Sequence, residues 1–164
     1  MEDKKILVIS DSHQDARVID EVIAKESPFD ILVHCGDSEG SLFLVQQREN
    51  PFEVYAVLGN CDYSGFPKEI FFTVGYYNFF VCHGHKHRVH NTNDDIVAAG
   101  KRNSADVVLF GHTHVPEISE EMGMLLVNPG SISLPKQASG KRSYAIVSIS
   151  EDYLPKAEIR YLDD

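Results

Sequence analysis

The sequence predicts an α/β protein in which two β-sheets pack face to face with helices on their outer sides. In the first 60 residues, apolar runs typical of buried strands alternate with amphipathic helical patterns, which indicates parallel strands joined by crossover helices. Beyond His114, short runs with β periodicity are separated by turns, which is typical of antiparallel strands. A chain of 164 residues suits a single domain over residues 1–164.

The first part of the chain predicts three parallel strands and two helices. Apolar residues at helical spacing follow the first strand, and Pro28 closes that helix. The second helical pattern is weaker and stops at Asn50-Pro51. The expected elements are, in order, a strand over 6–9, a helix over 15–26, a strand over 31–35, a helix over 38–49 and a strand over 54–58.

The remainder predicts mainly β structure around one further helix. Aromatic and β-branched runs on either side of Gly75 indicate a strand pair, and the polar residues 91–94 offer N-caps for a helix through Arg102. The expected elements are strands over 69–74 and 77–82, a helix ending at 102, a strand over 107–110, a hairpin of 117–120 with 124–127, a loop over 128–131, and a strand pair of 143–150 with 156–162.

Five of the expected strands end in short polar motifs. A single Asp or His after a strand is more often a turn former or a helix cap, but five such ends in one chain indicate a common site at one edge of the sheets. Glycines within four of these motifs let the backbone approach that site closely. The motifs are Asp11-Ser12-His13, Gly36-Asp37, Gly59-Asn60-Cys61-Asp62, His83-Gly84-His85 and Gly111-His112-Thr113-His114.

The side chains in these motifs are typical of a metal site with nitrogen and oxygen ligands. Such ligands suit manganese, iron, nickel or zinc in a reactive site, whereas a structural zinc site usually contains thiolates. Seven candidates are too many for one ion, so we expect two divalent ions bridged by Asp37. The candidate ligands are Asp11, His13, Asp37, Asn60, His83, His112 and His114.

Two bridged ions suit the hydrolysis of phosphate esters. A water shared by such ions loses its proton near neutral pH, and the resulting hydroxide can attack phosphorus in line while the ions neutralise the phosphoryl oxygens. No side-chain nucleophile is then needed. Consistently, the sequence contains no P-loop and no Gly-x-Ser-x-Gly motif.

The order of the five motifs resembles that of the calcineurin-like metallophosphoesterase family, in particular its small single-domain bacterial and archaeal phosphodiesterases. The resemblance implies a four-layer α-β-β-α sandwich of two mixed sheets flanked by helices. It also implies that manganese, or else nickel, iron, cobalt or zinc, occupies a dinuclear site. One ion would be held by Asp11, His13, Asp37 and His114, and the other by Asp37, Asn60, His83 and His112.

The chain departs from the family pattern at Cys61. The family usually has a histidine there, which acts as general acid and is held by the following aspartate, here Asp62. A neutral thiol donates a proton weakly, so we interpret Cys61 as a small filler. The alternative donor is His85, which the family pattern places near the phosphate and which could equally orient a metal ligand. The sequence therefore predicts catalytic roles for Asp37, Asn60, Asp62 and His85.

The other histidines are expected to lie outside the chemistry. His34, inside a strand, is interpreted as structural, and His87 and His90 as surface residues. The basic cluster of Lys86-His87-Arg88 with His90 suits either a solvated loop or the vicinity of a phosphate.

The composition limits the partners. A formal net charge of −10 disfavours binding to duplex nucleic acid, and no apolar run is long enough to span a bilayer. Three cysteines, an odd number, suit reduced thiols and a cytoplasmic protein. We therefore expect a small phosphoester substrate and no membrane partner. The aromatic runs Phe71-Phe72 and Tyr76-Tyr77 could cover a homo-oligomer interface.

Two other functions fit the same pattern less well. The family includes a non-catalytic retromer subunit with altered ligand positions, so the alternative hypothesis is a protein-interaction scaffold on the same fold. All seven ligand positions are kept here, which favours the enzyme. A dinuclear hydrolase of amides or lactams would show a different order of motifs.

Overall fold

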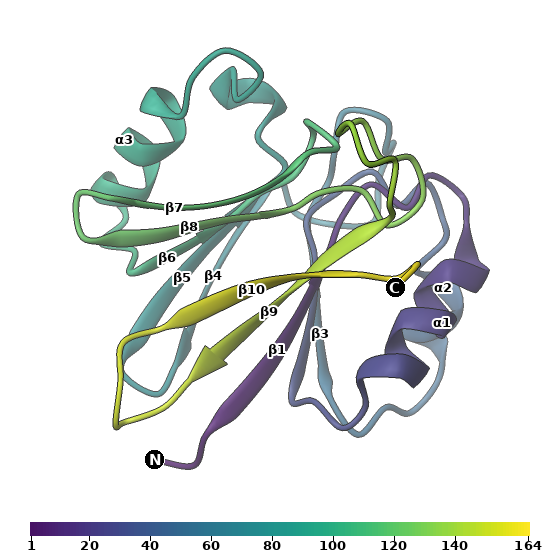
Figure 1. Cartoon of the computed structure of the whole chain (residues 1–164), viewed down its shortest axis with the longest axis horizontal. Coiled ribbons are helices and arrows are strands. Elements are labelled where there is room, and N and C mark those ends of the chain that lie inside the picture. The colour runs from purple at the N-terminus through teal and green to yellow at the C-terminus, as the bar shows by residue number, and fades with distance from the viewer.

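Two five-stranded sheets face each other, and helices cover their outer sides in the computed structural model, which describes residues 1–164 (Figure 1). Helices α1 and α2 lie on one side of the sandwich and α3 lies on the other (Figure 1). The elements are β1 (Lys4–Ile9), α1 (Ala16–Glu26), β2 (Ile31–His34), α2 (Phe43–Gln47), β3 (Glu53–Ala56), β4 (Glu69–Val74), β5 (Tyr77–Cys82), the 3₁₀ turn η1 (His85–His87), α3 (Asp94–Arg102), β6 (Val107–Leu109), β7 (Pro116–Glu121), β8 (Met124–Pro129), β9 (Ser143–Ile149) and β10 (Lys156–Tyr161).

Both sheets are mixed. The first sheet has the order β10-β9-β1-β2-β3, with β1, β2 and β3 parallel and β9 and β10 antiparallel to their neighbours. The second sheet has the order β4-β5-β6-β8-β7, with β5, β6 and β8 parallel and the edge strands β4 and β7 antiparallel. The predicted four-layer sandwich of two mixed sheets flanked by helices is confirmed.

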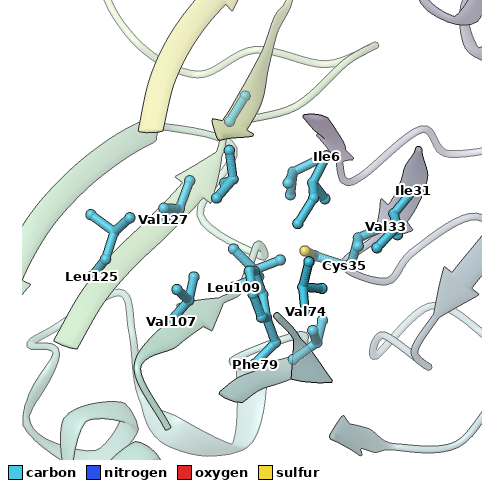
Figure 2. Packing of buried hydrophobic residues seen from close by; sticks show 14 of the residues in the cluster. Ile6, Ile31, Val33, Cys35, Val74, Phe79, Val107, Leu109, Leu125 and Val127 are labelled. Atoms are coloured by element: carbon cyan, nitrogen blue, oxygen red, sulfur yellow. The ribbon is translucent and has the colours of Figure 1, made fainter. Parts of the chain in front are cut away.

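Alternating side chains of β1 build two different layers of the core. Ile6 and Val8 face the second sheet and join the central cluster, whereas Leu7 and Ile9 face α1 and join the outer cluster. The central cluster contains residues from both sheets, such as Val33 and Leu109 (Figure 2). A third cluster lies between the second sheet and α3. Strands buried on both faces explain why the sequence shows continuous apolar runs there.

The first helix forms as predicted, but the second is much shorter. Asp15 caps α1, because its side chain accepts a hydrogen bond from the backbone N–H of Val18. The predicted helix over 38–49 is wrong in extent, because α2 covers only Phe43–Gln47. The backbone at Glu39 and Gly40 has positive φ angles of 47° and 86°, which a right-handed helix cannot contain. Residues 38–42 form a loop instead.

Most other boundaries differ from the predictions by a few residues. The turn η1 lies in a segment expected to be a loop, and Asn128 and Pro129, also expected in a loop, end strand β8. The predicted hairpin β7–β8 is confirmed, and its turn residues Met122 and Gly123 have φ angles of 51° and 79°. Helix α3 starts at Asp94, with two acidic residues in its first turn. None of the helices has the length and apolar character that crossing a bilayer would require.

The central cluster should dominate the stability of the fold. Leu109 on β6 is fully buried between the sheets, so Leu109→Ala should lower the free energy of unfolding by about 2–5 kcal/mol. Urea denaturation measures this change. Leu154→Ala is the matched control, because Leu154 is 75% exposed; it should change the free energy by less than about 0.5 kcal/mol. Equal effects of the two substitutions would contradict this account of the core.

Candidate metal centre

Backbone hydrogen bonds join four of the loops that carry the motifs in two pairs, and the His112 N–H links these pairs by donating to Asp11 Oδ2. Asp11 N–H donates to the carbonyl of Gly36 and His13 N–H to that of Asp37, both at 3.0 Å. Gly111 N–H donates to the carbonyl of His83, also at 3.0 Å. The loops after β1, β2, β5 and β6 therefore meet at one edge of the sandwich.

Three overlapping groups of side chains converge at this edge; one joins His13 and Asp37 to Cys61, and the other two contain only histidines and aspartates. In the first of these two, Asp11 Oδ1 lies 3.2 Å from Nε2 of His114 and 3.7 Å from Nε2 of His13. In the second, His83 Nε2 lies 3.3 Å from Asp37 Oδ2 and 3.3 Å from His112 Nδ1. The two groups are contiguous, because His13 Nε2 is 3.8 Å from Asp37 Oδ2. Each has the size and the donor atoms of a site for one cation.

Three of the histidines are held by acceptors behind them. The Nδ1 atom of His83 donates to the carbonyl of Cys35 at 2.7 Å, and that of His114 donates to the carbonyl of Leu134 at 2.7 Å. The Nδ1 atom of His13 faces the Glu39 carboxylate at 2.6 Å. Because these oxygens only accept, each Nδ1 carries a proton and each Nε2 points inward. This is how metal-binding histidines are usually oriented.

Asp11 is the most constrained carboxylate of the centre. It is fully buried, and its Oδ2 accepts hydrogen bonds from Ser10 Oγ at 2.6 Å and from His112 N–H at 3.1 Å. Its Oδ1 is buried and accepts none. A buried carboxylate oxygen without a donor is costly unless a cation or proton lies beside it. This oxygen faces the imidazoles of His114 and His13, so the residues fit a divalent ion.

The pKa values of the carboxylates and imidazoles in the centre reflect their close contacts with one another. Burial alone would raise the pKa of Asp11, but its contacts with His114 and His13 bring that pKa well below its usual value. The negative charge of the nearby Asp11 carboxylate, followed in effect by the contact with Glu39, raises the pKa of His13 to about 9. By contrast, burial and the neighbouring His83 lower the pKa of His112 to about 4. Without a metal ion, protonated His13 partly balances the carboxylates.

The backbone at the centre adopts an unusual conformation. Five candidate ligand residues have φ angles in the left-handed region, namely Asp11 (54°), His13 (40°), Asp37 (58°), His112 (73°) and His114 (60°). Residues other than glycine adopt this conformation at some cost, and such strain is concentrated at functional sites. A Cβ atom at Gly59 would come within 2.0 Å of Asp37 Oδ1, and one at Gly111 within 2.0 Å of Ser10 Oγ. Glycine is therefore required for this close approach.

Asp62 and Asn128 hold the loops from outside. Asp62 accepts three backbone hydrogen bonds at 2.8 Å, from the N–H groups of Asp37, Glu39 and Gly59. Asn128 is fully buried and donates to the carbonyl of Gly111 and to Thr113 Oγ1. Asp62 thus joins the loops after β2 and β3, and it positions Asp37 from behind.

His34 holds the loops after β1 and β2 from within the core. Its Nδ1 accepts from the backbone N–H of Gly36 at 3.1 Å, so its protonated Nε2 donates to Ser12 Oγ at 2.8 Å. Ser12 in turn lies 2.7 Å from Ser41 Oγ. Its place at the end of β2 agrees with the structural role predicted for it.

Asn60 and Cys61 lie at the open side of the centre. Both line a cavity of about 610 Å³ together with His13, Asp37 and His112. The Cys61 backbone N–H donates to Asp37 Oδ1 at 2.8 Å. Partial burial, together with the charge of Asp37, raises the pKa of the Cys61 thiol to about 11. The thiol is therefore protonated at neutral pH and a weak acid.

His85 lies beside the centre rather than inside its cavity. Its ring is 5.5 Å from that of His83 and 6.1 Å from that of His112. It lines a neighbouring hollow with Lys68 and Lys86, and its Nδ1 is buried without a hydrogen-bond partner. Burial, followed by the charge of His83, lowers its pKa.

Three residues near the centre could not be recognised as such from the sequence. Glu39 holds His13, the His90 ring lies 4.6 Å from that of His112, and Lys136 lines the cavity. Glu39 was expected inside a helix and His90 on the surface. His90 is exposed, yet it borders the cavity. In the sequence, only the basic cluster of Lys86-His87-Arg88 with His90 indicated that His90 could lie near a phosphate.

Comparison with known proteins agrees with this geometry. The model of the calcineurin-like phosphoesterase superfamily domain matches residues 5–152. A probable metallophosphoesterase of Bacillus subtilis, YsnB, is 38% identical over 162 residues, which cover 96% of this chain and 90% of the relative.

Two solved structures have the same fold. A predicted phosphoesterase of Streptococcus pneumoniae TIGR4 superposes with a TM-score of 0.84 at 29% identity, covering 99% of this chain and 92% of that one. An archaeal phosphodiesterase superposes with a TM-score of 0.72 at 25% identity, covering 95% of this chain and 99% of that one.

His34 should make the stability of the metal-free protein depend on pH. Burial lowers its pKa from 6.5 to about 4, so between these values the unfolded chain holds a proton that the folded chain lacks. Stability should therefore fall as the pH drops from 6.5 to 4, by about 3 kcal/mol over the whole window. The measurement is urea denaturation of the chelator-treated wild type and of His34→Gln between pH 7 and 4.

Because all other groups titrate in both proteins, the difference between wild type and variant isolates His34. We expect this difference to shrink as the pH falls. A difference that stays constant from pH 7 to pH 4 would show that His34 is not the group that titrates.

Proposed function

Because the chain belongs to the calcineurin-like phosphoesterase superfamily, we propose that it is a divalent-metal-dependent phosphodiesterase. One observation supports the metal dependence above all others. The buried Asp11 Oδ1 accepts no hydrogen bond and faces inward-pointing imidazole nitrogens, which is an arrangement that a cation would neutralise.

The donor groups suggest how two ions would be held. We propose Asp11, His13, Asp37 and His114 for one ion, and Asp37, Asn60, His83 and His112 for the other, with Asp37 shared. Nitrogen and oxygen donors suit manganese first, and nickel, iron, cobalt or zinc as well. When bound, such ions activate a water for attack on phosphorus and neutralise the phosphoryl oxygens.

The protein contributes orientation. Glu39 and the carbonyls of Cys35 and Leu134 fix the inward direction of three imidazoles, so these rings need not reorganise when a substrate arrives. Asp62 fixes the loop of Asp37 through three backbone hydrogen bonds. We therefore propose a positioning role for Asp62 in place of the direct support of a general acid.

Protonation of the leaving group is the step of the reaction that the side chains near the centre assist least. The pKa of Cys61 is raised to about 11 and that of His85 is lowered, so neither is a ready acid at neutral pH. His85 stays the candidate donor, with an unpartnered Nδ1 beside the centre. Turnover should therefore be fastest with leaving groups that need little protonation, such as 4-nitrophenolate.

The preference for diesters is supported by the archaeal phosphodiesterase of the same fold, which is 25% identical to this chain. The alternative, a non-catalytic scaffold, predicts that the purified protein contains little metal. Metal content after growth in manganese, followed by an assay on bis(4-nitrophenyl) phosphate, separates these proposals.

Asp37→Asn tests the shared ligand. The substitution removes a charge between the two groups, so metal content should fall from about two ions per chain, and turnover of bis(4-nitrophenyl) phosphate should fall at least about 100-fold. Elemental analysis and a phenolate-release assay measure both. Asp94→Asn, an exposed carboxylate on α3, is the control and should change neither. Full turnover by the wild type after chelation of its metal would contradict the proposed metal dependence.

Cys61→Ser tests the interpretation of Cys61 as a filler. Loss of a working general acid costs about 100-fold or more, whereas loss of a filler beside the site should cost less than about tenfold. We expect the smaller effect on bis(4-nitrophenyl) phosphate, with unchanged metal content. If the variant binds metal normally but no longer turns over this activated ester, Cys61 takes part in the reaction.

A further inference from the structure

A second cavity adjoins the metal centre. It has a volume of about 360 Å³ and lies between α2, the loop after β2 and the loop after β3. Cys61 lines both this cavity and the one at the metal centre, so the two meet at that residue. Cavities of this size hold small ligands. A substituent of a phosphoester bound at the centre could therefore reach into it.

Aromatic rings that are open to solvent line this second cavity. The Tyr63 side chain is completely exposed and Phe43 is 59% exposed, although both are large apolar groups. Phe66, also in the lining, is partly buried against the outer core cluster. Exposed aromatic rings around a hollow are typical of a surface on which a flat group stacks.

The polar groups of this cavity suit an uncharged ligand. No Lys or Arg lines it, and its carboxylates, Glu39 and Asp62, already accept hydrogen bonds from the protein. A second phosphate would meet these carboxylates and would be repelled. The amide of Gln46 offers both donor and acceptor groups, and Gln14, whose Nε2 donates to Glu39, offers its Oε1 as an acceptor; these groups match the edge of a nucleobase.

We propose that this second cavity binds the nucleobase of a nucleoside-bearing phosphodiester, with Phe43 and Tyr63 as the residues that determine specificity. The inference rests on the proposed phosphodiesterase function. Hydrolysis adds one water across a P–O bond and releases an alcohol and a phosphomonoester. The base lies between aromatic rings during this reaction, while Gln46 contacts its edge. A plain aryl ring shares the stacking but not the contacts at the edge.

Three substrates with the same leaving group test this proposal. They are the 4-nitrophenyl phosphodiesters of thymidine (at its 5′ oxygen), phenol and methanol. In Phe43→Ala and Tyr63→Ala, kcat/KM for the thymidine ester should fall about tenfold, whereas the methyl ester should change less than about twofold. Gln46→Ala should lower kcat/KM for the thymidine ester alone. Leu44→Ala is the matched control, because Leu44 is also 59% exposed on α2 but does not line the cavity.

Binding of thymidine itself separates this inference from the proposed function. Saturation-transfer NMR with metal-stripped wild type should detect thymidine, and Tyr63→Ala should weaken the signal. If no diester is hydrolysed but thymidine binds as described, the phosphodiesterase proposal fails and the cavity assignment stands. Equal losses on all three esters would overturn the assignment. So would equal losses on the thymidine and phenyl esters with no effect of Gln46→Ala, which would indicate an aryl site.

Discussion

The buried carboxylate of Asp11 is the constraint on which the rest of the centre depends. One of its oxygens is satisfied by Ser10 and by the backbone of His112, and the other is left facing imidazole nitrogens. An isolated carboxylate in such a place would be strongly unfavourable. The surrounding loops must therefore present either protons or cations to it. Because the donors come from both sheets, this one requirement couples the two halves of the sandwich at their common edge.

Rigidity of the loops follows from how they are anchored. The backbone of Asp11 and His13 bonds to the loop of Asp37, and the carbonyl of Asp11 accepts from the hydroxyls of Ser131 and Ser133. The contacts of Ser131 and Ser133 with Asp11 span 120 and 122 positions of the sequence, so the position of Asp11 does not depend on its own loop alone. Left-handed backbone conformations are tolerated because the neighbouring loops overdetermine them. The centre is thereby largely formed before any ion or substrate binds.

The convergence of the motifs could be predicted because the carboxyl ends of parallel strands share an edge. His83 and His112 come together for this reason, because they follow the parallel neighbours β5 and β6. Asp37 follows β2 of the other sheet, so its approach to His112, 75 positions away in the sequence, also depends on the face-to-face packing of the two sheets. Two features could not be predicted. Glu39 lies in a segment with a helical pattern, and only the positive φ angles at Glu39 and Gly40 turn it toward His13. The second feature is the pairing of β9 with β1. These strands are far apart in the sequence, and the periodicity of each strand does not indicate which partner it pairs with.

The electrostatic surroundings bear on which esters suit the centre. The chain has a formal net charge of −10, and carboxylates line the centre and the cavity beside it. A phosphomonoester has a charge of about −1.5 to −2 at pH 7, whereas a diester has a single negative charge. Around the cavity of Phe43 and Tyr63, which Glu39 and Asp62 line without any Lys or Arg, the local field disfavours a second charge and the extended charge of a polyanion. Lys68 and Lys86 line the hollow of His85 and not the cavity of Phe43 and Tyr63, so they do not offset the carboxylates there. For the phosphodiesterase function that we propose, this arrangement of charges would favour a diester whose substituent in that cavity is flat and uncharged.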